Sequence, residues 1–283
     1  MPEPEKARPQ ITAFSALQIW LTAALLLVVA SLVFGLVLAQ VLGGPDAKDL
    51  LSDPARSPLL NDPTWIAIGT LVNEAAALGA FALWWFKLKA PREAMPLGSP
   101  RPLAVLGALL LTFGTAPYAE AVGELVHRVV KNDVTASRVV VAAARGASDA
   151  ELVLLLFSLA VVPALVEEAL FRGLITAAFR NNMLLAVVVP SVMFGLFHLE
   201  PTQAAGTVLL GAAFGYARLC TDSLGVSMIA HGVYNAVVLL VVRFSAEVTE
   251  HEISIAPLLF GAVLIAAGVA VLRQQRVSKP PPA

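Results

Sequence analysis

The dominant pattern along the chain is a series of apolar runs separated by short polar segments. Most runs have about the length that an α-helix needs to cross the hydrocarbon core of a bilayer, roughly 20 residues. Only Glu200-Pro201 separates the fifth run from the sixth. The pattern predicts an all-α fold, a polytopic transmembrane helical bundle of about eight spans: residues 16–42, 65–86, 102–122, 151–180, 183–199, 202–219, 224–243 and 256–272.

Two segments need a separate interpretation. A secretory signal peptide is the alternative for residues 16–42, but the run exceeds the ~7–15 residues of a signal core, so we expect a retained helix. Residues 124–150 interleave charges with valines and predict one or two amphipathic helices at the membrane surface. Since no repeat or domain boundary interrupts the pattern, residues 1–283 are predicted to form one integral-membrane domain, with polar tails at 1–10 and 273–283.

Composition supports a membrane protein and excludes several other classes. Hydrophobic residues make up 58% of the chain and charged residues 14%, too little charge for the surface of a soluble protein of 283 residues. The net charge of −1, without a basic stripe, argues against nucleic acid as a partner. The single cysteine excludes an intrachain disulfide. Most of the 19 Lys and Arg residues fall on the side of the N-terminus, so both termini are predicted to be cytoplasmic.

The fourth run carries ionisable residues in otherwise apolar surroundings. Glu167, Glu168 and Arg172 lie within it, and Pro163 predicts a kink just before them. Glu168 and Arg172 are four residues apart and share one helix face, in the order that favours an ion pair. Glu167 lies about 100° further around the helix. We therefore expect Glu168 and Arg172 to pair and Glu167 to be available for chemistry.

Two histidines in later runs complete the set. His198 ends the fifth run, and His231 lies in the seventh, with Asn235 one helical turn beyond it. A lone membrane histidine often only bonds a neighbouring helix. Burying all these groups is costly unless they meet, so we expect a polar cavity between helices four, five and seven. At roughly 1.5 Å per residue, Glu167 and His198 lie about 20–24 Å from the same face.

These residue types match two kinds of hydrolytic chemistry. A buried carboxylate beside a water held by two histidines can act as a general base and then as a general acid. His198, His231 and Glu167 are also candidate ligands of a divalent metal such as zinc, and the sequence leaves open whether any metal is used. The chain has neither a G-x-S-x-G nor an H-E-x-x-H motif. In the second run, Asn73 and Glu74 have two interpretations, an interhelical hydrogen bond or a lining of the cavity.

The ordered set Glu167-Glu168-x-x-x-Arg172, Phe194-x-x-x-His198 and His231-x-x-x-Asn235 resembles the CPBP family of intramembrane endopeptidases, which includes CAAX proteases and bacteriocin-processing proteins. The resemblance covers about residues 151–243, the expected catalytic core. It implies that Glu167 activates water, that His198 and His231 hold the water or a metal, and that Asn235 donates a hydrogen bond in the transition state. It also implies that Glu168, Arg172 and Phe194 support the site.

The function expected from this resemblance is hydrolysis of a peptide bond in a membrane-associated protein or peptide. The Ala, Val, Leu, Arg and Pro content is typical of bacteria and predicts an inner-membrane location. Two alternatives remain at this stage: a membrane scaffold or immunity protein that cleaves nothing, and a transporter that uses Glu167, His198 and His231 as a proton relay. The expected partners are the lipid bilayer and a membrane-associated protein or peptide substrate.

Overall fold

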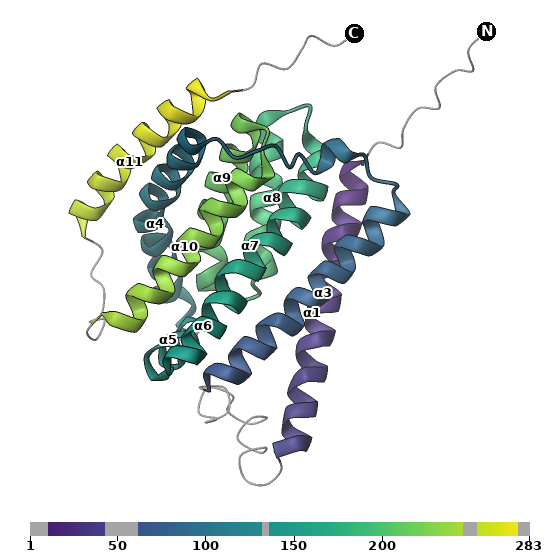
Figure 1. The fold of residues 1–283 in the computed structure, drawn as a ribbon, viewed down its shortest axis with the longest axis vertical. Helices are drawn as coiled ribbons and strands as arrows, with labels where there is room; N and C mark the ends of the chain where they lie inside the picture. The colour runs from purple at the N-terminus through teal and green to yellow at the C-terminus, as the bar shows by residue number, and fades with distance from the viewer. Residues whose placement is uncertain (1–10, 43–61, 132–135, 246–253, 277–283) are drawn as a thin grey trace.

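The computed structural model describes residues 11–42, 62–131, 136–245 and 254–276. These residues form helices and connecting turns, and no β-strand occurs among them (Figure 1). In chain order the helices are α1 (Ala13–Leu42), α3 (Pro63–Lys87), η2 (Arg92–Ala94), α4 (Pro102–Val130), α5 (Ala136–Gly146), α6 (Asp149–Leu156), η3 (Phe157–Val161), α7 (Val162–Glu167), η4 (Glu168–Ile175), η5 (Thr176–Phe179), α8 (Met183–Phe197), α9 (Pro201–Thr221), α10 (Leu224–Phe244) and α11 (Ile255–Gln274). The prediction of an all-α helical bundle is confirmed.

Six helical stretches of the described chain are long and apolar enough to cross a membrane. They are α1, α3, α4, the composite helix Asp149–Phe179, α10 and α11. The other two predicted spans are present as the helices α8 and α9 but do not meet these criteria. With 15 residues, α8 is about 22 Å long, which is short of a hydrocarbon core of roughly 30 Å. The eight predicted spans therefore correspond to six long apolar helices, the short helix α8, and α9, which has 21 residues but is not among the apolar spans.

The largest difference from the predicted boundaries concerns the third span. It was predicted to end at residue 122, but α4 continues to Val130 and ends at Lys131, which has a left-handed backbone with φ 50°. Glu124 and Arg128 form an ion pair of 2.8 Å on this last part, which supports further turns of helix. The predicted surface helix is consequently shorter, and α5 begins at Ala136.

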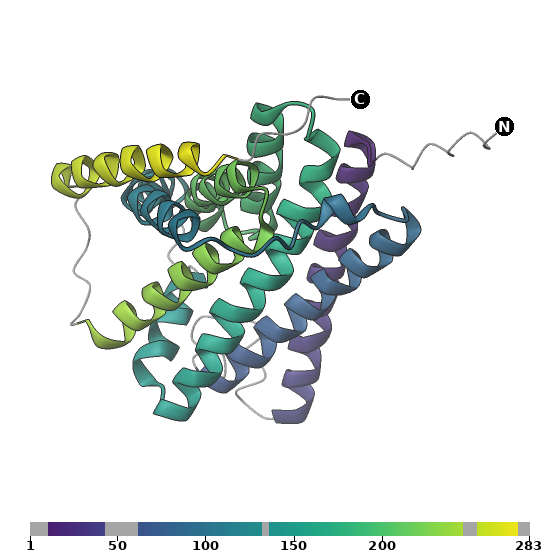
Figure 2. The same cartoon turned by 45° about the horizontal axis from the view of Figure 1, so that its top comes forward.

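The bundle is assembled from adjacent helix pairs. Figures 1 and 2 show α11 beside α4 at one edge and α1 beside α3 at the opposite edge. Glycines let α4 and α11 approach closely, as is common between membrane helices. A Cβ at Gly114 would lie 2.7 Å from the backbone nitrogen of Ile265, and one at Gly268 would lie 2.6 Å from that of Leu111. Between these edges, α8, α9 and α10 surround the composite helix.

Two π-helical segments interrupt the α-helical hydrogen bonding of the composite helix. Its segments η3 and η4 are π-helical turns, and Pro163 lies at the start of α7, between them. A proline cannot donate to the carbonyl four residues earlier, and its ring clashes with that carbonyl, so a local change of winding is expected there. The second π-helical turn contains Glu168 and Arg172. At the predicted kink, the structure therefore has π-helical segments on both sides of Pro163, and the second contains the ionisable residues.

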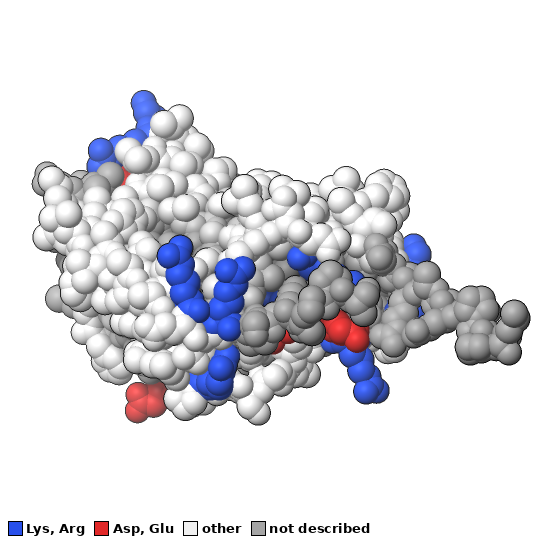
Figure 3. Space-filling model, turned by 90° about the horizontal axis from the view of Figure 1, so that it is seen from above, with Lys and Arg blue, Asp and Glu red and all other residues white. Residues whose placement is uncertain are grey.

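Basic side chains gather at the end of the bundle that bears both termini. Figure 3 shows this end, with Lys and Arg more numerous than Asp and Glu. The helix ends and loops that meet here contain Lys87, Lys89, Arg92, Arg101, Arg180, Arg218, Arg273 and Arg276, against Glu93 and Asp222. A hydrogen bond from Arg101 Nη2 to the carbonyl of Gln275 joins two of these segments.

Candidate active site

Glu168 and Arg172 form a fully buried ion pair at the centre of the bundle. Arg172 Nη1 lies 3.0 Å from Glu168 Oε1, and both side chains have no exposed surface. Arg172 Nη2 donates to the carbonyl of Gly211 on α9 at 3.0 Å, and its guanidinium lies 4.2 Å from the centre of the Phe194 ring. The pairing predicted from the spacing of four residues is therefore present. The guanidinium also joins the composite helix to α8 and α9.

His231 on α10 faces both glutamates. Its Nδ1 lies 3.2 Å from Glu168 Oε1, and its Nε2 lies 3.7 Å from Glu167 Oε2. The ring stacks on Phe214 with a centroid distance of 4.7 Å, and Phe194 meets it edge to face at 5.8 Å. When Nδ1 carries the proton and donates it to Glu168, Nε2 is left as an acceptor directed towards Glu167. The two adjacent carboxylates therefore contact different nitrogens of one imidazole.

His198 occupies the end of the short helix α8. Its Nδ1 lies 3.0 Å from the carbonyl of Phe194, to which it donates when it carries the proton. Its ring lies edge to face against Phe194 at 5.1 Å, so both site histidines pack on the same aromatic side chain. Phe194, predicted to support the site, is 1% exposed. The structure therefore brings His198 to the neighbourhood of His231 through Phe194.

Asn235 contacts the composite helix. Its Nδ2 donates to the carbonyl of Leu159 in η3 at 3.1 Å. It lies one turn beyond His231 on α10, as expected, but this amide hydrogen bond goes to the backbone of another helix. An asparagine amide has two N–H groups, so a second donor remains for the site.

The described residues do not form a metal-binding cluster. They contain no group of three or more His, Cys, Asp or Glu side chains that could hold a metal ion. His231 contacts Glu168 and Glu167, while the bond recorded for His198 is to a backbone carbonyl. The arrangement does not fit the three-ligand zinc site considered from the sequence, and no step below involves a metal.

A comparison with protein families finds a match to the part of the chain that contains these residues. A family model described as Rce1-like, type II CAAX prenyl endopeptidase, matches residues 149–237. Residues 149–237 are thus similar to the Rce1-like family. The match covers about a third of the chain, runs from the start of α6 into α10, and includes all the site residues described above. No curated protein and no solved structure matches the chain.

Within this segment, the contacts that three residues of α9 make with the site were not predicted from the sequence. Phe214 stacks on His231, the carbonyl of Gly211 accepts from Arg172, and Arg218 Nε donates to the carbonyl of Arg172 at 3.1 Å. All three lie on α9. Their spacing by three or four residues places Gly211, Phe214 and Arg218 on one helix face. This spacing is the feature of the sequence that could have indicated their shared contact with the site.

Asn73 and Glu74, which had two interpretations from the sequence, have different surroundings in the structure. Asn73 Oδ1 accepts a hydrogen bond of 2.8 Å from Ser31 on α1, so it makes the interhelical contact. Glu74 lies on another face of α3, is 7% exposed and has no hydrogen-bond partner at Oε2. Glu74 therefore belongs to the interior.

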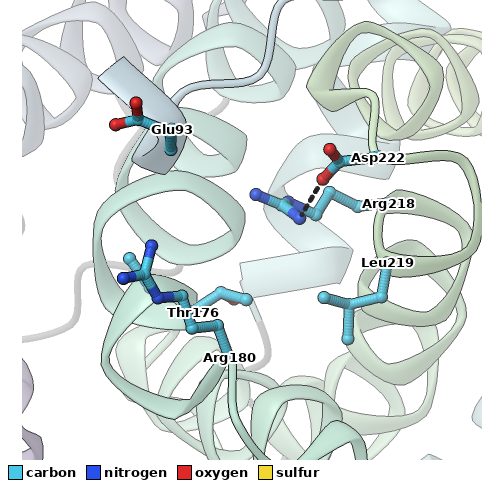
Figure 4. A pocket seen from close by; sticks show the side chains of 7 residues that line it. Glu93, Thr176, Arg180, Arg218, Leu219 and Asp222 are labelled. Atoms are coloured by element: carbon cyan, nitrogen blue, oxygen red, sulfur yellow. Dashed lines mark hydrogen bonds and ion pairs between the residues drawn. The ribbon is translucent and has the colours of Figure 1, made fainter. Parts of the chain in front are cut away.

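A cavity lies closer to the basic end of the bundle. It measures about 240 Å³ and is lined by Glu93, Thr176, Ala177, Arg180, Arg218, Leu219 and Asp222 (Figure 4). Arg218 Nη1 pairs with Asp222 at 3.2 Å in its wall. None of the predicted catalytic residues lines this cavity, so it is distinct from the one expected between helices four, five and seven.

Proposed function

We propose that this chain hydrolyses a peptide bond of a membrane-associated protein or peptide with a water molecule activated by Glu167. The observation that carries the proposal is the position of His231, with Nδ1 at Glu168 and Nε2 3.7 Å from Glu167. A carboxylate next to an imidazole whose orientation is fixed by a second carboxylate has the base-and-orienter arrangement found in many hydrolases. The Rce1-like match over residues 149–237 independently supports endopeptidase activity.

The proposed reaction needs proton transfers that Glu167 can carry out. Glu167 accepts a proton from water as the water oxygen attacks the scissile carbonyl carbon. It then delivers that proton to the leaving amine as the carbon–nitrogen bond breaks, which restores the carboxylate. The nitrogens Nε2 of His198 and His231 help to orient the water. The second N–H of Asn235 stabilises the negative charge on the carbonyl oxygen, a role in which one donor commonly contributes about 10²–10³-fold to kcat.

Glu168 and Arg172 have a supporting role in this proposal. The carboxylate of Glu168 is shared between Arg172 and His231, with 3.0 and 3.2 Å to the two partners. It therefore fixes the tautomer of His231 and offsets the buried positive charge. Its neighbour Glu167 has no guanidinium within ion-pair distance among the described residues, which leaves it available to accept a proton.

The proposed location is a bacterial inner membrane with both termini in the cytoplasm. The basic end shown in Figure 3 bears the termini, and an excess of Lys and Arg is typical of the cytoplasmic side. Prenylated CAAX proteins are the substrates named for the matched family. Because such substrates are not expected in bacteria, we propose the wider class of membrane-associated proteins and peptides.

A comparison of membrane proteomes between the wild type and a Glu167→Gln strain tests the function. Uncleaved N-terminal or C-terminal peptides should accumulate in the variant, while its membrane insertion is unchanged. Glu124→Gln, at an ion pair near the end of α4, is the matched control and should process normally. Normal processing in the Glu167→Gln strain would contradict the proposal and favour the scaffold or immunity alternative. Ion-coupled uptake by the wild-type protein in proteoliposomes that is lost in Glu167→Gln would favour the transporter alternative.

A further inference from the structure

Glu74 is a buried acid that the mechanism above does not use. It lies on the buried face of α3 together with Ala67, Ala77 and Trp84. Its side chain is 7% exposed, and Oε2 is enclosed without a hydrogen-bond partner. An isolated buried carboxylate is costly, so its position requires a compensating interaction.

The neighbourhood of Glu74 is the ionisable part of the composite helix. Helix α3 packs against α7, which ends at Glu167, and against η4. The two residues also match in depth. Glu74 is 13 residues from Lys87 at the end of α3, and Glu167 is 13 residues from Arg180, so each lies about 20 Å from the basic end.

The charges at this level of the bundle do not balance without a proton. Three carboxylates, Glu74, Glu167 and Glu168, lie at this level. The guanidinium of Arg172 is paired with Glu168, and the titratable His231 lies 3.7 Å from Glu167 and 3.2 Å from Glu168. Two nearby carboxylates in apolar surroundings resist simultaneous ionisation, and such pairs hold one proton between them. The other elements packed against α3 supply few charges. Helix α1 has no ionisable residue from 13 to 42, and those of α5 and α6 are Arg138, Arg145, Asp149 and Glu151, near the opposite end.

We propose that Glu74 is a positioning residue whose protonated carboxyl group donates a hydrogen bond to the Glu167 carboxylate and holds it towards the reacting water. Glu74 keeps its proton through the cycle, and Glu167 alone exchanges a proton with water and the leaving amine. The inference rests on the proposed hydrolytic function. It assigns a role to a residue outside the segment matched by the family model.

Kinetics of the purified full-length protein in detergent or liposomes test this role, with Asn73→Ala as the neighbouring control. Glu74→Ala should lower kcat roughly 10–100-fold with little change in KM, because it removes a donor that orients the base. Glu74→Gln keeps an N–H donor and should recover most of that loss. It should also lack the fall in rate at high pH that occurs when Glu74 loses its proton. Asn73→Ala should leave kcat unchanged.

Other outcomes have a definite meaning. A rise in KM at constant kcat would show that Glu74 lines the substrate path and would overturn the positioning role. Equal inactivation by Glu74→Gln and Glu74→Ala, with an unchanged pH profile, would also overturn it. If Glu167→Gln is inactive and both Glu74 variants behave as the wild type, only this inference fails. If Glu167→Gln is fully active, the proposed function fails.

A spectroscopic measurement is independent of any substrate. Infrared difference spectra of the purified protein should contain the carbonyl stretch of a buried protonated carboxyl group. That band should be lost in Glu74→Gln and perturbed in Glu167→Gln, and it should be unchanged in Asn73→Ala. A wild-type spectrum without a protonated carboxyl band near neutral pH would contradict a protonated Glu74. A band that Glu74→Gln leaves unchanged would contradict it as well.

Discussion

The side-chain amide of Asn235 donates a hydrogen bond to the carbonyl of Leu159, 76 residues earlier in the chain and 3.1 Å away. Leu159 lies four residues before Pro163, which has no N–H to offer that carbonyl in an α-helix. Asn235 therefore supplies a donor that the composite helix lacks. One residue ties α10 to this helix just before Glu167, in addition to the transition-state role proposed for it.

These two roles of Asn235 can be separated by a double-mutant cycle. Asn235→Ala should lower the free energy of unfolding by about 1–3 kcal/mol, because the Leu159 carbonyl loses a partner. In a Pro163→Ala background, residue 163 regains its N–H, and Asn235→Ala should cost about 1 kcal/mol less. Unfolding of each variant in detergent measures its free energy of unfolding. Peptide cleavage measures its activity.

The activity of the same variants identifies the chemical role. If Asn235 also stabilises the transition state, the loss of roughly 10²–10³-fold in kcat should persist in the Pro163→Ala background. Restoration of kcat together with stability would instead leave Asn235 with only the structural role. Thr115→Ala, which removes a side-chain bond to the carbonyl of Leu111 in α4, serves as a control for a lost hydrogen bond distant from the site.

The sequence allowed the helices to be predicted well because apolar runs of membrane length are strong local signals. The pairing of Glu168 with Arg172 was equally local, since it follows from a spacing of four residues. Pro163 predicted a disturbance of the fourth helix, but not its form as two π-helical segments, because a proline does not determine how the neighbouring turns rewind. Glu74 and Asn73 looked alike in the sequence, and only the packing of α3 between α1 and the composite helix distinguishes them.

The same limit applies to His231. Its spacing to Asn235 was visible, but its contact with both glutamates depends on how α10 packs against the composite helix. The α8–α9 hairpin is also a tertiary outcome. A helix of 15 residues cannot reach across the hydrocarbon core, and its end at His198 is stable because the imidazole bonds back to Phe194 within the interior.

Removing one member of the buried ion pair should destabilise the protein strongly. Glu168→Gln leaves Arg172 without its carboxylate in an unexposed position, and we expect a loss of about 3–5 kcal/mol in the free energy of unfolding. Arg128→Ala breaks the ion pair with Glu124, whose side chains are 55% and 31% exposed, and should cost less than about 1 kcal/mol. Chemical unfolding in detergent compares the two, and equal costs would contradict the structural role of the buried pair.

Two glycines of α9 provide a test of how tightly Arg172 is held. A Cβ at Gly211 would lie 3.0 Å from Arg172 Nη2 and 3.1 Å from Phe194 Cδ1, which is closer than ordinary contact. Gly211→Ala should therefore displace Arg172, cost about 1–3 kcal/mol and lower activity. At Gly215 the nearest atom would be 3.8 Å away, so Gly215→Ala should be neutral or stabilise the helix by up to about 1 kcal/mol. If Gly211→Ala and Gly215→Ala had similar effects on the free energy of unfolding and on activity, Arg172 would tolerate displacement.

The orientation of the bundle can be measured with single cysteines. The native Cys220 is buried, so it should react little with a membrane-impermeant maleimide, and Cys220→Ala removes the remaining background. Arg92→Cys, at the basic end, should be labelled in inverted inner-membrane vesicles if this end, with its excess of Lys and Arg, faces the cytoplasm as proposed. Lys131→Cys, just after α4 at the opposite end, should be labelled in intact spheroplasts instead. The reverse pattern would show that the termini face the other side and that Glu167 lies about 20 Å from the periplasmic face.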